Sequence, residues 1–190
     1  MVKVAFIVEG KVEQIIIDYL HSNGWFTQFN IEKIGPTIDA KGGGNLCPRN
    51  MPIYVAEAQT HNPDKIFILT DLECDPCVTK TKERLGDCDE CTIVLAKKAI
   101  EAWFLADDEL LLSLTNGELN HYDEPEGTTQ MPYDELKAIL LETTGRGTGT
   151  KASFALRVKR LGFNMDNAAS HVNCPSAKYF IDKLHAVGRN

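Results

Sequence analysis

Residues 3–20 read KVAFIVEGKVEQIIIDYL, and the fold prediction starts from this stretch. Its first part, KVAFIV, is mostly apolar and lacks polar alternation, which is typical of a strand buried on both faces of a sheet. The strand is predicted to end at Glu9. Apolar side chains then recur at helical spacing, among them Val12, Ile16 and Leu20. The stretch therefore predicts a strand, a tight turn and a helix.

Three later segments share the character of buried strands, at 31–35, 65–70 and 92–96. Helical periodicity predicts helices at 51–61, 78–85 and 98–114. Because strands and helices alternate, we expect an α/β fold in which helices flank a mainly parallel four-stranded sheet. Active residues in such sheets lie at the carboxyl ends of the strands.

The pattern changes after Leu114. Residues 115–133 are polar and rich in turn-forming residues, which predicts a loop. Three helices are predicted to follow, at 134–142, 152–161 and 176–187. We therefore expect an α/β domain over residues 1–114 and a helical C-terminal subdomain over 115–190 that packs on it.

Composition narrows the classes of function. The chain has 190 residues, is 43% hydrophobic, and has no apolar run of the roughly 20 residues that a membrane helix needs. Its start predicts a strand and not a signal peptide, so a cytoplasmic protein is expected. A net charge of −7 argues against a broad basic surface that coats nucleic acid, but it is compatible with a catalytic groove that holds magnesium.

Two of the predicted strands end in a carboxylate, at Glu9 and at Asp71. Neighbouring strands lie about 4.8 Å apart, so both carboxylates could reach one metal ion. Glu13 follows on the first helical turn, while Glu73 and Asp75 follow Asp71 at steps of two residues. The alternative is that Glu9 caps the helix and the later acids are solvated loop residues.

Two segments resemble known motifs. IVEGKVEQIIIDYL, residues 7–20, resembles the first motif of the Toprim domain, and IFILTDLE, residues 66–73, resembles the second. KKAIEAWFLAD, residues 97–107, is similar to small stand-alone Toprim-like proteins that are linked to phage defence. The second motif usually carries two aspartates, whereas this chain has Asp71 followed by Glu73.

The resemblance covers about residues 3–107 and implies a Rossmann-like Toprim fold. Toprim domains occur in topoisomerases, bacterial primases, recombination-mediator proteins and the overcoming-lysogenization-defect nucleases. They hold magnesium for nucleotidyl transfer or strand cleavage. The resemblance thus implies a nuclease, or a nucleotidyl- or phosphoryl-transfer enzyme, that uses Mg²⁺ or Mn²⁺ on DNA or RNA in phage defence. It also implies a partner ATPase, and it leaves a homodimer open.

On this resemblance, the catalytic residues would be Glu9, Asp71 and Glu73. The magnesium ligands would be Glu9, Glu13, Asp71, Glu73 and Asp75. The alternative is a binding module for nucleic acid or nucleotide in which catalysis is lost or depends on a partner. The acidic net charge and the Glu73 departure favour that alternative.

Two Cys-x2-Cys pairs are typical of a tetrahedral structural zinc site, here within an insertion at 74–91. Its ligands would be Cys74, Cys77, Cys88 and Cys91. Buried unligated thiols and a redox switch are the alternatives.

Three lysines are candidate phosphate contacts, although ordinary surface loops are the alternative for each. They are Lys11, Lys41 and Lys151. Lys11 begins a predicted helix, where backbone N–H groups favour anions. Glu101 is expected on a solvated helix face; the alternative is that it reaches the acidic site. The histidines show no ligand pattern; they are His21, His61, His121, His171 and His185.

Overall fold

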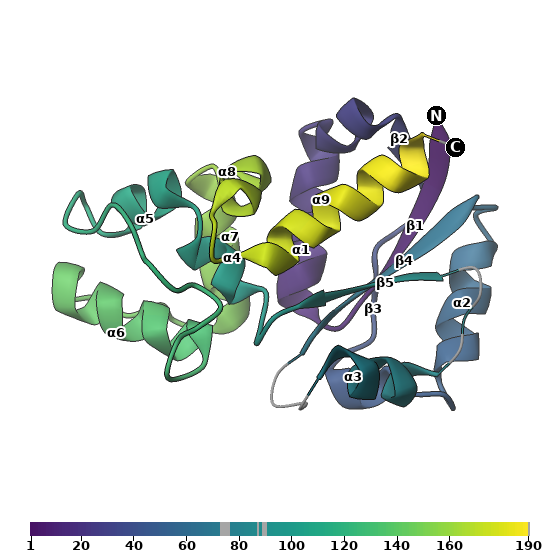
Figure 1. Ribbon diagram of the computed structural model, residues 1–190, viewed down its shortest axis with the longest axis horizontal. Helices are drawn as coiled ribbons and strands as arrows, with labels where there is room; N and C mark the ends of the chain where they lie inside the picture. The colour runs from purple at the N-terminus through teal and green to yellow at the C-terminus, as the bar shows by residue number, and fades with distance from the viewer. Residues whose placement is uncertain (73–76, 87, 89–90, 190) are drawn as a thin grey trace. The chain divides into compact units, whose positions relative to one another are not determined.

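The computed structural model describes residues 1–72, 77–86, 88 and 91–189 (Figure 1). The chain divides into two compact units. The first consists of Met1–Leu95 and Phe180–Asn190, and the second of Ala96–Tyr179. This division differs from the predicted boundary at 114/115. The reason is that helices α4 (Glu101–Leu105) and α5 (Asp108–Leu114) pack with the helices of the second unit.

The first unit contains a five-stranded sheet. The strands are β1 (Val2–Val8), β2 (Ile31–Lys33), β3 (Ile38–Asp39), β4 (Lys65–Asp71) and β5 (Cys91–Ala96). Their order is β2-β1-β4-β5, and β3 pairs separately with β1. β1 is parallel to β2, β3 and β4. The α/β fold with a mainly parallel sheet is confirmed. The fifth strand, β3, lies between the predicted strand at 31–35 and the predicted helix at 51–61, where no strand was predicted.

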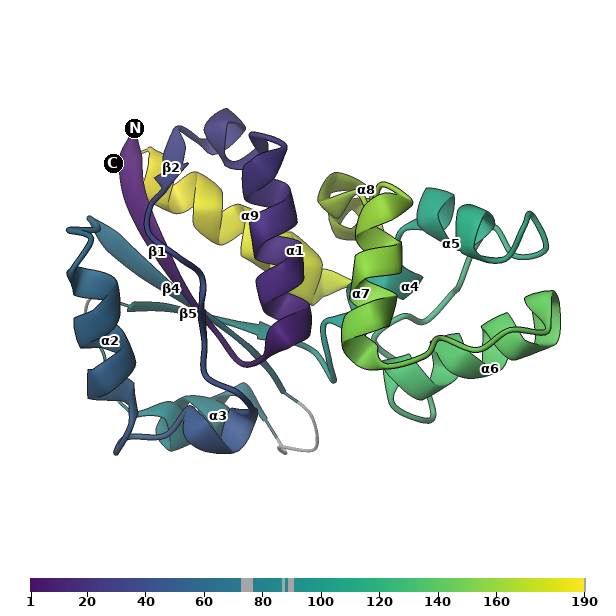
Figure 2. The same ribbon diagram turned by 180° about the vertical axis from the view of Figure 1, so that it is seen from behind.

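Both faces of the sheet are covered by helices (Figure 1, Figure 2). Helices α1 (Lys11–Ser22) and α9 (Pro175–Gly188) cover one face, and α2 (Met51–Gln59) and α3 (Val78–Leu85) cover the other. Successive β1 residues serve the two faces: Phe6 contacts Phe26 and Phe67, whereas Ile7 belongs to the cluster that includes Leu85. This double coverage explains why the strand sequences lack polar alternation.

The second unit is helical. Besides α4 and α5 it contains α6 (Pro132–Thr144), α7 (Lys151–Arg160), α8 (Met165–Ser170) and the first residues of α9. Its core includes Phe104 packed against Phe154 and Phe163, and the indole N–H of Trp103 donates to Ser176 Oγ at 2.8 Å. Within the described residues, none of the helices combines the length and apolarity that crossing a membrane requires.

The helix predicted at 98–114 is interrupted at Asp107. The backbone of Asp107 is extended, and its Oδ1 accepts a hydrogen bond of 3.2 Å from Leu110 N, so Asp107 caps α5. Its Oδ2 accepts a hydrogen bond of 2.7 Å from Asn164 N, at the start of α8. The side chain is only 1% exposed, and burial raises the pKa of Asp107 above its ordinary value. One buried carboxylate thus begins one helix and secures another.

Candidate metal centre at the strand ends

Glu9 connects the carboxyl ends of β1 and β4. Its backbone N–H donates to Leu69 O at 3.0 Å, which continues the parallel register of the two strands. Its Oε2 accepts hydrogen bonds from Asp71 N at 2.9 Å and from Thr70 Oγ1 at 2.5 Å. The structure thus brings the backbone N–H of Asp71 to the Glu9 carboxylate. The catalytic roles of both residues remain predictions.

Glu13, and not Glu9, caps the first helix. Gly10 is the extended N-cap residue of α1, and its backbone N–H donates to Glu13 Oε2 at 3.0 Å. The Glu13 side chain is buried, with 5% exposure, beside the turn that carries Glu9. The alternative interpretation, in which Glu9 is the capping carboxylate, is therefore wrong. The Glu9 side chain instead faces β4.

A glycine-rich turn fits against the Glu9 carboxylate. Gly42 has a positive φ of 116°, and its N–H donates to Glu9 O at 2.8 Å. A Cβ added at Gly43 would lie 2.8 Å from Glu9 Oε1, closer than real Cβ atoms approach. Gly43 therefore leaves the space that this carboxylate occupies. The Lys41 side chain is exposed. Its role as a phosphate contact remains a prediction.

Asp39 also lies at this edge of the sheet. It ends β3 and is paired in register with Val8, the residue before Glu9. Its Oδ1 accepts a hydrogen bond of 2.7 Å from Lys41 N. The site prediction missed Asp39 because β3 has only two residues. The signal that could have found it is the pair Ile38-Asp39, in which an apolar residue precedes an acid, as Val8 precedes Glu9 at the end of β1.

Two predicted magnesium ligands, Glu73 and Asp75, lie outside the described residues. Among the phosphate candidates, Lys11 is exposed at the start of α1, where its Nζ donates to Gln14 Oε1 at 2.7 Å. Lys151 belongs to the second unit, so the structure does not test its prediction as a phosphate contact at the strand ends.

Lys151 instead pairs with a buried acid of its own unit. Its Nζ lies 3.4 Å from Glu101 Oε1. Glu101 is 1% exposed, so the expectation that this glutamate is solvated on a helix face is wrong. Trp103 and Phe104 of the same short helix are fully buried, and Glu101 is buried together with them.

The cysteines of the predicted zinc site are described only in part. Cys88 and Cys91 form a disulfide with a Cα–Cα distance of 5.3 Å, and Cys77 is exposed at the start of α3. Cys74 lies outside the described residues. Zinc binding by these four residues would require the reduced thiols. In the structure Cys88 and Cys91 are therefore oxidised, as the redox alternative requires of a pair. The zinc site remains a prediction.

The donors at the strand ends are suited to a hard cation. Glu9, Glu13 and Asp71 supply carboxylate oxygens, which Mg²⁺ and Mn²⁺ prefer. Hydrogen bonds fix Glu9 and Glu13, and Gly43 leaves space at Oε1 of Glu9. These residues therefore fit a magnesium site in donor chemistry. In placement they do not form a group whose donor atoms all lie within 4.8 Å of one another, a condition that Asp108, His121 and His171 meet among the described residues.

No protein-family model matches the chain, and no curated protein matches it. Among solved structures, the chain is similar to the C-terminal region of the Burkholderia pseudomallei OLD protein, with 16% identity and a TM-score of 0.46. The similarity covers 97% of this chain and 99% of that one.

Proposed function

We propose that this chain is a Toprim-like, metal-dependent nuclease, or a nucleotidyl- or phosphoryl-transfer enzyme, that acts on nucleic acid with Mg²⁺ or Mn²⁺ held at the strand ends. One observation carries the proposal: the Glu9 carboxylate is fixed across the ends of β1 and β4, next to Asp71 and Glu13. Metal-dependent chemistry at a phosphodiester needs a bound ion, and carboxylates at the ends of neighbouring strands are candidates to hold it. The setting that we propose is cytoplasmic phage defence beside a partner ATPase.

The protein would contribute orientation and charge. Glu9, Glu13 and Asp71 would hold the metal, and Glu73 and Asp75 would complete its ligands. When bound, the ion would neutralise charge that develops on the phosphate and lower the pKa of an attacking water. Glu9 would act as a ligand or as a general acid or base through Oε1, while Thr70 and the Asp71 amide hold Oε2.

The N-terminus of α1 supports the phosphate side of the proposal. Backbone N–H groups at the start of this 12-residue helix favour an anion, and the exposed Lys11 is the first helical residue. A phosphate that approaches the Glu9-Gly10 turn would therefore meet positive charge beside the carboxylates.

A binding module without catalysis is the second candidate. Two observations favour it: the net charge of −7 opposes long polyanions, and Glu73 stands where the Toprim motif usually has an aspartate. A module of this kind would bind nucleic acid or nucleotide without cutting it.

The experiment that separates the two candidates is a cleavage assay with labelled plasmid, single-stranded DNA and RNA, in Mg²⁺ or in Mn²⁺. Wild type is compared with Glu9→Gln and Asp71→Asn. Glu57→Gln, on the exposed side of α2, is the matched control. Circular dichroism establishes that each variant is folded. Metal-dependent cleavage that both site variants lose and the control keeps would support the nuclease. Binding without cleavage by folded wild type would favour the binding module.

A further inference from the structure

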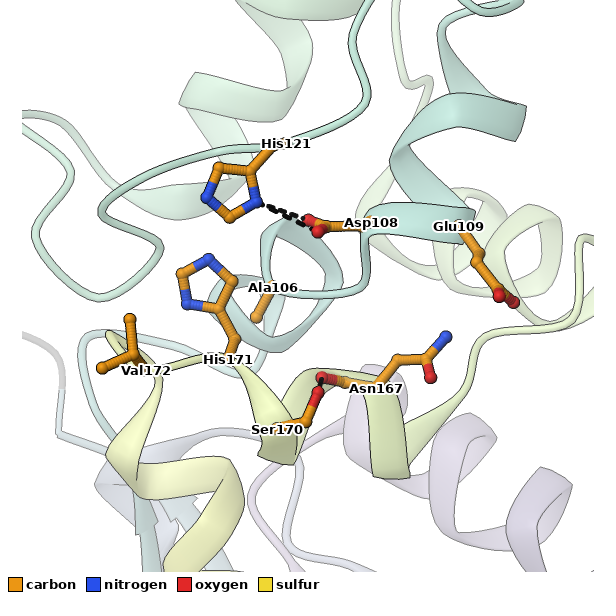
Figure 3. A pocket seen from close by; sticks show the side chains of 8 residues that line it. All are labelled: Ala106, Asp108, Glu109, His121, Asn167, Ser170, His171 and Val172. Atoms are coloured by element: carbon orange, nitrogen blue, oxygen red, sulfur yellow. Dashed lines mark hydrogen bonds and ion pairs between the residues drawn. The ribbon is translucent and has the colours of Figure 1, made fainter.

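A second group of metal-binding side chains lies in the helical unit, outside the strand-end centre. Asp108 is the first residue of α5, His121 lies in the segment before α6, and His171 follows α8 directly (Figure 3). One donor atom from each of the three residues lies within 4.8 Å of the other two. The three residues belong to one compact unit, so this arrangement is internal to it.

The distances are close to those of a bound ion. His121 Nδ1 lies 3.0 Å from each carboxylate oxygen of Asp108. The imidazole rings of His121 and His171 are stacked, with 5.0 Å between centroids and 19° between planes. Ligand atoms about 2.0–2.1 Å from a tetrahedral zinc ion are about 3.3 Å apart. Small side-chain movements would therefore complete a metal geometry.

His171 provides an independent observation. Its Nε2 is buried and has no hydrogen-bond partner among the described residues. The ring extends toward the space between His121 and Asp108 (Figure 3). A buried ring nitrogen without a partner is costly, because it loses its bond to water and gains none in return. An ion between these side chains would supply the missing partner.

One local hydrogen bond determines the cost of binding. His171 Nδ1 accepts a hydrogen bond of 3.1 Å from Asn173 N. A metal at Nε2 needs the tautomer that is protonated at Nδ1, so this bond would be lost. The turn would nevertheless keep its place, because Asn173 Nδ2 donates to Asp123 O at 2.8 Å and to Glu124 Oε1 at 3.1 Å.

The surroundings favour a cation over an anion. The three side chains line a cavity of about 430 Å³, which Glu109, Asn167 and Ser170 also line. Asp108 and Glu109 make the cavity negative, and the exposed Asp123 lies 3.5 Å from His121 Nε2. Two imidazoles in the donor set select zinc and similar transition metals, whereas Mg²⁺ and Ca²⁺ prefer oxygen.

We propose that Asp108, His121 and His171 bind a divalent transition metal of the zinc class. Three protein ligands leave one coordination position, which faces the cavity and takes water or the donor atom of a small ligand. An ordinary ion pair between His121 and Asp108 would account for two of these residues, but it leaves the buried Nε2 of His171 unexplained. The site does not depend on the proposed nuclease function.

The test is metal binding by the full-length protein after treatment with a chelator. Zn²⁺ is titrated by calorimetry, and Co²⁺ is titrated while its absorption is recorded. The site variants are Asp108→Asn, His121→Ala, His171→Ala and, as a conservative alternative, His171→Gln. His21→Ala removes an exposed histidine of the first unit and is the matched control. Cys77→Ser separates this site from the cysteines, since Co²⁺ bound by thiolate gives charge-transfer absorption and Co²⁺ bound by His and Asp does not.

We expect each site variant to weaken Zn²⁺ binding by on the order of 100-fold or more, since removal of outer-sphere partners alone costs about 10- to 100-fold. His21→Ala and Cys77→Ser should retain the binding, and the Co²⁺ complex should show no thiolate band. The proposal is overturned if folded His171→Ala and His171→Gln bind Zn²⁺ as tightly as wild type. It is also overturned if Cys77→Ser alone abolishes binding.

Discussion

The strand-end centre of the first unit and the His-Asp group of the second unit are built in different ways. Glu9 and Asp71 directly follow buried parts of two parallel strands, and the register of the strands brings them together. Asp108, His121 and His171 come from separate segments that only the packing of α5, α8 and the loop between α5 and α6 assembles. Hydrophobic periodicity can therefore reveal the first kind of site and hides the second.

The largest expected effect tests whether the strand-end carboxylates act as one unit. Glu9→Gln and Asp71→Asn should each reduce metal-dependent cleavage by on the order of 100-fold or more, because each removes a charge that the chemistry needs. The double variant should lose little more than the worse single variant, since residues of one catalytic unit are not additive. Initial rates of plasmid cleavage measure this. Multiplication of the two single effects would mean that the carboxylates act separately.

Asp107→Ala tests how far the second region depends on packing. It removes the cap of α5 and leaves Asn164 N, at the start of α8, without its acceptor. We expect the free energy of unfolding to fall by about 2–4 kcal/mol, as measured by urea denaturation. Zn²⁺ binding should weaken with it, since α5 carries Asp108. Glu142→Ala, exposed near the end of α6, should change stability by about 0.5 kcal/mol or less.

A stable Asp107→Ala protein that keeps its Zn²⁺ affinity would contradict this dependence on packing.

Gly43→Ala sharpens the description of the strand-end centre. The new Cβ would lie 2.8 Å from Glu9 Oε1 and would displace the carboxylate. The rate of cleavage should fall by roughly tenfold, since even a small misplacement of a catalytic group lowers the rate. Gly44→Ala is a close control, because a Cβ there meets no atom within 4 Å. Equal activity of the two variants would show that the Glu9 position is not limiting.

The smallest expected effect concerns Lys33, which is buried on β2. Burial lowers the pKa of Lys33, and the nearby Asp18 partly opposes this shift. The unfolded chain therefore binds more protons than the folded protein between the lowered pKa and the ordinary value of 10.5. Stability from this residue should thus rise with pH through that window. Lys33→Met should remove the rise, as shown by urea denaturation at several alkaline pH values.

Lys65→Met, at an exposed strand position, should leave that pH dependence as it is in wild type.

The sequence allowed the sheet and part of the centre to be predicted, for physical reasons. Every predicted strand forms, because long apolar runs can be buried only between layers of helices. β3 was not predicted, because a strand of two residues shows no periodicity. The break between α4 and α5 was not predicted, because both helices are apolar and only the cap by Asp107 separates them. The His-Asp group could not be predicted, since its residues lie in segments without regular spacing.

The position of α9 in the sequence determines when one face of the sheet becomes covered during synthesis. Phe180 of α9 contacts Trp25 and Phe67 in the first unit, although the residues before it, Ala96–Tyr179, form the other unit (Figure 1). A ribosome therefore releases β1, β4 and β5 long before the helix that covers this side of them. During synthesis, the aromatic face of the sheet must stay incompletely covered, or be shielded by a chaperone, until α9 has been made.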